Sequence, residues 1–238
     1  MNDQNVSAYL ETACEAARRG AAVLEHWRGK FQVREKGRAD LVSEADLESQ
    51  KTIQSFFQEQ FPEHLFLGEE DPTAEKRPEK DSPPVWIVDP LDGTTNYVHD
   101  VPAYAVSIGL WMDEEMVVGV VYDPSRDEMF RAAKGQGAWI NDTRIQVSET
   151  REVARALIGV GFPPDLTKHR EALHWFDRYS FAAQSLRRTG STALNLAYVA
   201  AGRFDGFWAF DNHVWDVDGG VVLILEAGGL LTNIDGPE

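Results

Sequence analysis

The sequence predicts an α/β (α+β) fold, a layered sandwich of helices and sheets. Helical periodicity opens the chain, a strand-rich stretch fills its middle, and helices alternate with strands towards its end, a pattern that favours stacked helix and sheet layers. No internal repeat, heptad pattern or low-complexity linker divides the 238 residues. We therefore expect one domain covering residues 1–238.

Two amphipathic helices are expected at the amino-terminal end. The first ends near Arg28 and Gly29, because apolar residues recur up to that point at helical spacing: Val6, Leu10, Ala13, Ala17, Ala21 and Leu24. The second runs from Ser43 to Phe61 and is stopped by Pro62. Its apolar side contains Leu47, Ile53, Phe56 and Phe57.

Short strands dominate the middle of the chain. Strands are expected at 64–67 and 85–88, and the charged, proline-rich segment 69–84 between them predicts a mobile loop. Further strands are expected at 104–111, 116–122, 128–132 and 137–140, with an acidic turn at 113–115. The Gly-Gln-Gly at 135–137 predicts a hairpin turn, since a nucleotide-binding loop needs a third glycine and a following helix.

The carboxyl-terminal part alternates between the two kinds of element. A buried strand is expected at 156–161, a helix at 168–184, a second helix at 193–201 closed by Gly202, and a strand at 205–210. An apolar helix at 217–227 then ends at two glycines.

Composition excludes several functional classes. Apolar residues make up 43% and charged residues 26%, as in ordinary soluble proteins, and no stretch reaches the ~20 apolar residues that span a bilayer. The net charge of −16 argues against nucleic-acid or anionic-membrane partners. The amino terminus lacks a signal-peptide core, and the single Cys14 allows no internal disulfide, so we expect a cytoplasmic protein.

The most informative segment is 89–96, Asp-Pro-Leu-Asp-Gly-Thr-Thr-Asn, directly after the apolar strand 85–88. Two carboxylates at a strand end can hold a divalent cation, and the Gly-Thr-Thr turn can direct backbone N–H groups towards an anion. A bound cation would also offset the repulsion between an acidic protein and a phosphorylated substrate. This combination indicates phosphate ester chemistry.

Other acids near the ends of expected elements have simpler structural explanations. Asp46, three residues after Ser43, fits a capping box, and Asp216 fits an N-cap before an apolar helix. Glu69 and Glu70 begin a charged loop, where surface acids are common. Asp89 and Asp92 are harder to explain, because central strands seldom end in two acids followed by Gly-Thr-Thr.

The residue types also indicate the metal. Oxygen ligands without a cysteine or histidine cluster favour Mg²⁺ or Mn²⁺ over zinc. The six histidines show no zinc-ligand spacing, and only His213 lies near one of the acids, Asp216. The sequence has neither a Gly-x-Ser-x-Gly elbow nor a glycine-rich loop ending in Lys-Ser/Thr.

The motifs resemble those of the inositol monophosphatase family, the lithium-sensitive, magnesium-dependent phosphatases. Segment 89–96 resembles the first family signature, and Trp-Asp-Val-Asp-Gly-Gly at 215–220 resembles the second. Further matches occur in the family's order at Lys36, 40–43, Asp46, 68–70, 190–193, 203–206 and 226–229. The resemblance covers nearly the whole chain and implies the αβαβα sandwich, with mixed sheets, shared with fructose-1,6-bisphosphatases.

The resemblance also implies a role for each site residue. Glu69, Asp89 and the Leu91 carbonyl would hold one Mg²⁺, and Asp89, Asp92 and Asp216 a second, with Glu69 contributing to a third. Catalysis is assigned to Asp46, Thr94 and Glu69, with Asp46 and the Thr94 hydroxyl activating water. The implied substrate contacts are Asp92, Gly93, Thr94, Gly190, Ser191, Thr192 and Asp216.

The substrate is implied less specifically. Family members that act on inositol phosphate often carry a glutamate seven residues before the acid of the second signature, where this chain has Ala209. A small phosphorylated alcohol of the inositol monophosphate kind is expected, with histidinol phosphate, fructose bisphosphate and nucleotide 3′-phosphate as alternatives. A non-catalytic binding or regulatory protein with the same fold is a further alternative. A homodimer is implied, and the family's last carboxyl-terminal elements are expected to be missing after residue 238.

Overall fold

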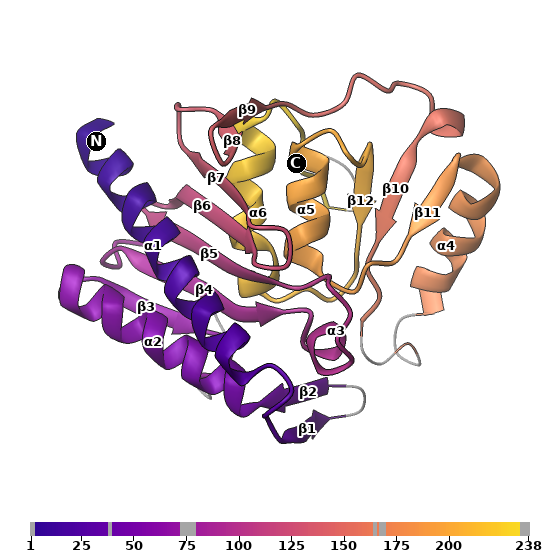
Figure 1. Ribbon diagram of the computed structural model, residues 1–238. Helices are drawn as coiled ribbons and strands as arrows, with labels where there is room; N and C mark the ends of the chain where they lie inside the picture. Colours follow the sequence, from indigo (N-terminus) through magenta and orange to yellow (C-terminus); the bar gives the residue numbers. More distant parts are fainter. Residues whose placement is uncertain (1–2, 38–39, 72–79, 164–165, 167–169, 234–238) are drawn as a thin grey trace.

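The computed structural model describes residues 3–37, 40–71, 80–163, 166 and 170–233. Five layers stack across the molecule, two of them β-sheets that alternate with helical layers (Figure 1). The expected αβαβα sandwich is therefore confirmed. Among the described residues, no helix is both long enough and apolar enough to cross a membrane.

The first helical layer consists of α1 (Asp3–Trp27) and α2 (Glu44–Gln60). These helices pack against each other and against one face of the large sheet (Figure 1). Their apolar faces are buried there, with Leu10, Leu24, Ile53 and Phe57 at most 5% exposed. Phe57 stacks on Trp86 of the sheet at a ring distance of 4.1 Å, which ties the helical layer to the strand that carries the acidic motif.

The large sheet has seven strands in the order β3-β4-β5-β6-β7-β8-β9. Its strands are β3 (Leu65–Gly68), β4 (Val85–Asp92), β5 (Ala105–Met112), β6 (Glu115–Asp123), β7 (Glu128–Ala133), β8 (Ala138–Ile140) and β9 (Thr143–Ile145). Only β3 and β4 are parallel, and all other pairs are antiparallel. The carboxyl ends of β3 and β4 therefore lie at the same edge of the sheet.

Helices α5 (Thr192–Ala200) and α6 (Val214–Glu226) cover the other face of the large sheet. Beyond them lies a parallel three-stranded sheet in the order β11-β10-β12, formed by Ser185–Arg187, Leu157–Val160 and Gly206–Trp208. Helix α4 (Arg170–Ala182) packs on its outer side (Figure 1). All three strands point their carboxyl ends to one edge, where ligands commonly bind in such sheets.

The structure differs from the predicted elements at several places. It adds the hairpin β1 (Val33–Gly37) and β2 (Asp40–Ser43), the short helix α3 (Thr94–Val98), the 3-10 turn η1 (Val153–Arg155), and strands β9 and β11. These segments are too short for periodicity to reveal them. The expected start of a helix at Lys168 and residues 72–79 of the expected loop 69–84 lie outside the described residues.

Two predicted boundaries at the site are wrong. Strand β4 does not end at Val88 but continues to Asp92, with a register shift against β5 between Asp89 and Asp92. Helix α6 begins at Val214 rather than at residue 217, so Asp216 lies inside its first turn and is not the N-cap. In β4 the regular element extends over the two acids Asp89 and Asp92, which are buried there.

Candidate active site

Asp89 lies at the centre of the acidic cluster. It projects from β4, is 2% exposed, and accepts a hydrogen bond from the Leu91 amide at 2.9 Å. Burial raises the pKa of Asp89 well above its ordinary value, and the negative charges of Glu69, Asp92 and Asp216 raise it further. Four carboxyl groups that sequence analysis placed in one site therefore influence one another in the fold.

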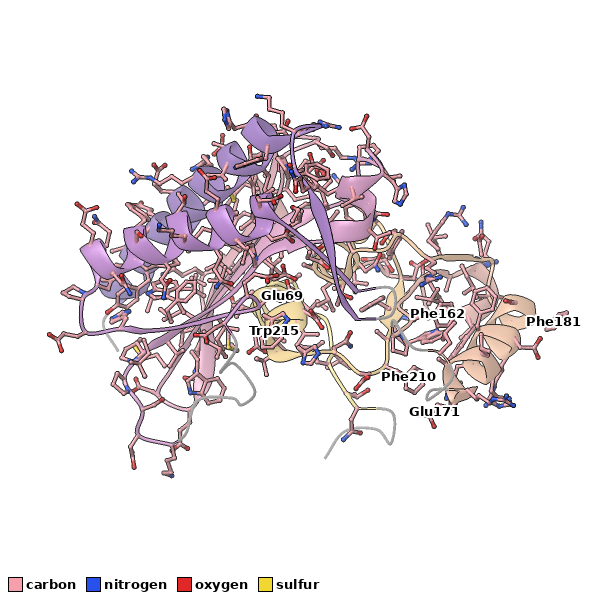
Figure 2. The ribbon with its side chains drawn as sticks, turned by 90° about the horizontal axis from the view of Figure 1, so that it is seen from below. Glu69, Phe162, Glu171, Phe181, Phe210 and Trp215 are labelled. Atoms are coloured by element: carbon pink, nitrogen blue, oxygen red, sulfur yellow. The ribbon has the colours of Figure 1, made fainter. Side chains whose placement is uncertain are left out.

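Glu69 reaches this cluster because β3 runs parallel to β4. It follows directly after β3, and its amide donates to the Val88 carbonyl at 3.1 Å, which continues the ladder by one residue. Its carboxyl group is hydrogen-bonded to that of Asp89. Figure 2 shows Glu69 and Trp215, the residue before Asp216, in the middle of the same face of the molecule.

Asp92 is bound by the amino-terminal end of α5. Its carboxylate accepts hydrogen bonds from the Ser191 hydroxyl, from the Thr192 amide at 3.1 Å and from the Ala193 amide at 2.7 Å. Burial raises the pKa of Asp92 to about 6, although these hydrogen bonds oppose the shift. The predicted substrate contacts Ser191 and Thr192 therefore touch a predicted metal ligand.

Asp46 and Thr94 form the second part of the site. Asp46 is fully buried in the first turn of α2, where its Oδ2 accepts from the Ser43 amide at 2.9 Å and from the Ser43 hydroxyl at 2.5 Å. The Thr94 hydroxyl lies 3.3 Å from the other oxygen of Asp46 and 3.2 Å from the Leu91 carbonyl. The predicted Asp46–Thr94 pair is thus present and adjoins the backbone of the acidic motif.

Asp216 is oriented in the same way as Asp46. It is the third residue of α6, and its Oδ2 accepts from the His213 amide at 2.7 Å. The His213 ring stacks on Trp215 at 4.7 Å, which fixes the entry to the helix. The capping box predicted at Asp46 is confirmed. In both helices, the acid that caps the helix is also one of the predicted site residues.

The donor chemistry of this cluster fits a hard divalent cation. The negative charge of the buried Asp89 is opposed by three further carboxyl groups, and carboxylate oxygens are ligands that such cations prefer. Within the described part of the chain, however, no three acidic, histidine or cysteine side chains lie close enough to hold a metal ion as they stand.

The predicted glycines occupy special backbone conformations. Gly93, between β4 and α3, has a φ of +99°, and Gly190, before Ser191, has a φ of +88°. A Cβ atom on Gly190 would lie 2.8 Å from the Asn96 amide nitrogen, so the two loops of the site approach each other closely there.

Sequence reasoning missed three residues that connect the site: Asn96, Thr189 and Asn195. The Asn96 side chain donates to the Thr189 carbonyl at 2.8 Å, and the Thr189 hydroxyl donates to Asn195 at 2.7 Å. Asn96 ends the first signature, which was the available signal. Its partner lies 93 residues away, and no local pattern predicts that distance.

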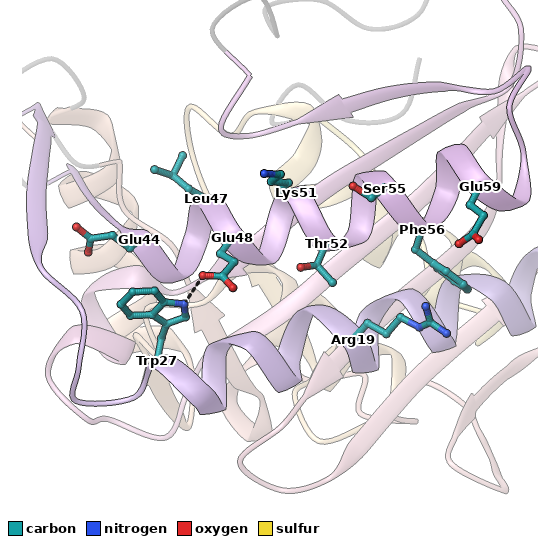
Figure 3. A pocket seen from close by; sticks show the side chains of 10 residues that line it. All are labelled: Arg19, Trp27, Glu44, Leu47, Glu48, Lys51, Thr52, Ser55, Phe56 and Glu59. Carbon is teal, nitrogen blue, oxygen red and sulfur yellow. Dashed lines mark hydrogen bonds between the residues drawn. The ribbon is translucent and has the colours of Figure 1, made fainter.

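A separate hollow of about 750 Å³ lies between α1 and α2 (Figure 3). Trp27 donates to Glu48 across it at 2.7 Å, and the Arg19 guanidinium lies 4.0 Å from the centre of the Phe56 ring. None of the predicted site residues lines this hollow, so it is distinct from the acidic cluster.

Comparison with known proteins places this site in a family. The model of the inositol monophosphatase family matches residues 5–238. The inositol-1-monophosphatase of Synechocystis sp. is 40% identical over 234 residues, which are 97% of this chain and 80% of that protein.

Solved structures agree with this match. The extragenic suppressor protein suhB from Bartonella henselae superposes with a TM-score of 0.90 at 39% identity, over 97% of this chain and 89% of that one. The inositol monophosphatase from Anabaena gives a TM-score of 0.86 at 39% identity, over 98% and 86% of the two chains. The fold is that of inositol monophosphatases, which are phosphoric monoester hydrolases. The chain belongs to the inositol monophosphatase family.

Proposed function

We propose that the protein is a Mg²⁺-dependent phosphatase that hydrolyses the monoester of a small phosphorylated alcohol of the inositol monophosphate kind. The observation that carries this proposal is the burial of Asp89 among the charges of Glu69, Asp92 and Asp216 in a chain of this family. Such a cluster is costly without a cation and becomes favourable when one binds.

Under this proposal, the acidic residues of the chain bind the metal ions. Glu69, Asp89 and the Leu91 carbonyl would hold one Mg²⁺, Asp89, Asp92 and Asp216 a second, and Glu69 would contribute to a third; Mn²⁺ suits the same oxygen donors. When bound, the ions lower the pKa of an attacking water and stabilise the charge that develops on the phosphoryl and leaving oxygens.

Thr94 and Asp46 would receive the proton of that water. The Thr94 hydroxyl lies within hydrogen-bond reach of Asp46 Oδ1, while Ser43 occupies Oδ2 and keeps the carboxylate in place. The Gly93 and Thr94 amides, together with the Gly190–Thr192 loop, would contact the phosphate group. An in-line displacement needs mainly such positioning and charge stabilisation.

The alcohol is the less determined part of the substrate. Ala209 follows β12, beside a cavity of about 380 Å³ whose lining also includes Trp175, Tyr179, Trp208 and Phe210. A methyl group cannot accept a hydrogen bond from a sugar hydroxyl, so we expect weaker discrimination among alcohols than a glutamate would impose.

Phosphate release tests the proposal. Purified protein is assayed with myo-inositol 1-phosphate, histidinol phosphate, fructose 1,6-bisphosphate and a nucleoside 3′-phosphate, each with Mg²⁺ and with a chelator. We expect Mg²⁺-dependent turnover that the Asp89→Asn variant loses by at least about a thousandfold, because the negative charge that would hold the ions is gone.

Asp123→Asn is the matched control. Asp123 is also fully buried, but it pairs with Arg126 at 2.8 Å outside the cluster, so its loss should affect stability and not the chemical step. Wild-type turnover by Asp89→Asn would reject the proposed site. No Mg²⁺-dependent turnover of any monoester by the wild type would reject the proposed activity in favour of a binding protein.

Two further properties belong to the same proposal. Inhibition by lithium and a homodimeric state are expected of a member of this family, and an inhibition series and light scattering would test them. A cytoplasmic location stays a prediction of the sequence.

A further inference from the structure

Asn96 joins two segments of the site that are distant in sequence. It lies in α3, directly after the acidic motif, and its side chain is partly buried. One amide nitrogen donates two hydrogen bonds, to the Ala103 carbonyl at 2.6 Å and to the Thr189 carbonyl at 2.8 Å. The first bond fixes the side chain to its own half of the molecule, and the second fixes the loop before α5.

Thr189 is held from two sides. Its carbonyl accepts from Asn96, and its hydroxyl donates to Asn195, which is 1% exposed in α5. Gly190, the next residue, has a φ of +88° and passes so close to Asn96 that a Cβ atom there would lie 2.8 Å from the amide nitrogen. The loop therefore has little freedom at this point.

The loop leads directly to the groups that bind Asp92. Ser191 is 1% exposed, and its hydroxyl, together with the Thr192 and Ala193 amides, donates to that carboxylate. A shift of Thr189 would displace these three donors together and rotate the carboxylate.

We propose that Asn96 is a positioning residue for the metal site: it anchors Thr189 and thereby orients Asp92 through Ser191, Thr192 and Ala193. This inference rests on the proposed function, in which Asp92 is a metal ligand. Asparagine suits the position because the amide presents two N–H groups to two carbonyls. Aspartate of the same shape would place a negative oxygen against both carbonyls.

The test uses Asn96→Ala and Asn96→Asp in the full chain. We expect the Mg²⁺ concentration for half-maximal phosphate release to rise about tenfold or more, the usual cost of removing a group that orients a metal ligand. The turnover rate at saturating Mg²⁺ should change by a smaller factor than the half-saturating Mg²⁺ concentration. A residue with only a structural role would lower the melting temperature and leave half-saturation by Mg²⁺ unchanged.

A second readout does not depend on activity. Hydrogen–deuterium exchange of the metal-free protein should show faster exchange at residues 189–194 in both variants, because the Thr192 and Ala193 amides lose their fixed acceptor. This measurement keeps the inference testable even when the wild type releases no phosphate, an outcome that would reject the proposed function alone.

Asn141→Ala is the matched control. The Asn141 side chain also bridges backbone groups, accepting from the Met129 amide at 3.0 Å and donating to the Asp127 carbonyl at 3.1 Å, but it lies in the turn between β8 and β9. It should change neither Mg²⁺ half-saturation nor exchange at 189–194.

Gly190→Ala supplies an independent route to the same displacement. It should raise the Mg²⁺ concentration for half-maximal activity, as Asn96→Ala does. In free-energy terms, the increase in the double variant should be smaller than the sum of the two single increases, because both substitutions release the same contact between Asn96 and the loop. Wild-type half-saturation and exchange in Asn96→Ala and Asn96→Asp, or additive effects in the double variant, would overturn the inference.

Discussion

Asp46 and Asp216 each occupy the third position of a helix and accept a hydrogen bond from the backbone just before it. Capping consumes one oxygen of each carboxylate and fixes the side-chain rotamer. At Asp46 the second oxygen faces Thr94 at 3.3 Å. A structural role and a site role therefore coexist in one side chain.

Asp92 makes the site sensitive to pH. Burial raises its pKa to about 6, and a cation can bind only when the carboxyl group has lost its proton. We predict that Mg²⁺ affinity falls as the pH drops through 6, approaching tenfold per unit for each proton displaced. Half-saturating Mg²⁺ measured from pH 5 to pH 8 checks this, and a flat profile would contradict it.

At the scale of elements, glycines allow α6 to pack closely against the large sheet. A Cβ atom on Gly119 of β6 would lie 2.4 Å from the Gly219 carbonyl oxygen of α6, and one on Gly219 would collide with the Ser107 hydroxyl of β5. This close approach sets the distance between Asp216 at the start of α6 and the acids of β4.

We predict that Gly119→Ala destabilises the fold by about 1–3 kcal/mol, because the neighbouring atom is backbone and cannot turn away. It should also raise half-saturating Mg²⁺, since α6 must move outwards. Chemical denaturation and Mg²⁺ titration measure the two effects. Gly206→Ala in β12 is the control, because a Cβ atom there meets nothing within 4 Å. Equal stability of the two variants would exclude this packing argument.

At the scale of the whole molecule, the site brings together residues from α2, from the carboxyl-terminal ends of β3 and β4, and from the starts of α5 and α6. In the metal-free protein, raised carboxyl pKa values oppose folding once the unfolded chain has ionised, so stability should fall as the pH rises above about 4 and through about 6, where Asp92 ionises. Under the proposed function, a cation bound at neutral pH would reverse this cost.

We predict that Mg²⁺ at about a hundred times its Kd raises the wild-type melting temperature by about 5–10 °C at pH 7. Asp89→Asn, which removes a buried charge, should melt higher than the wild type without metal and respond little to Mg²⁺. Scanning calorimetry with Mg²⁺ and with a chelator tests this. A variant that Mg²⁺ stabilises as much as the wild type would contradict it.

Much of the fold could be predicted because long elements carry their own pattern. The helices α1 and α2 and the strands β4 to β7 follow periodicities that burial later confirms. The hairpin β1–β2, α3 and β11 escaped prediction because segments of three to five residues owe their conformation to neighbours.

The sequence by itself determined the family, the layered fold and the types of residue at the site, because the acids, glycines and hydroxyls stand in contiguous motifs. Only the tertiary structure decided how these groups are held: Asp92 by α5, Thr94 beside Asp46, and Thr189 by Asn96. It also decided the raised pKa of Asp89. These properties depend on atoms brought together from distant parts of the chain, and a local pattern contains no information about such contacts.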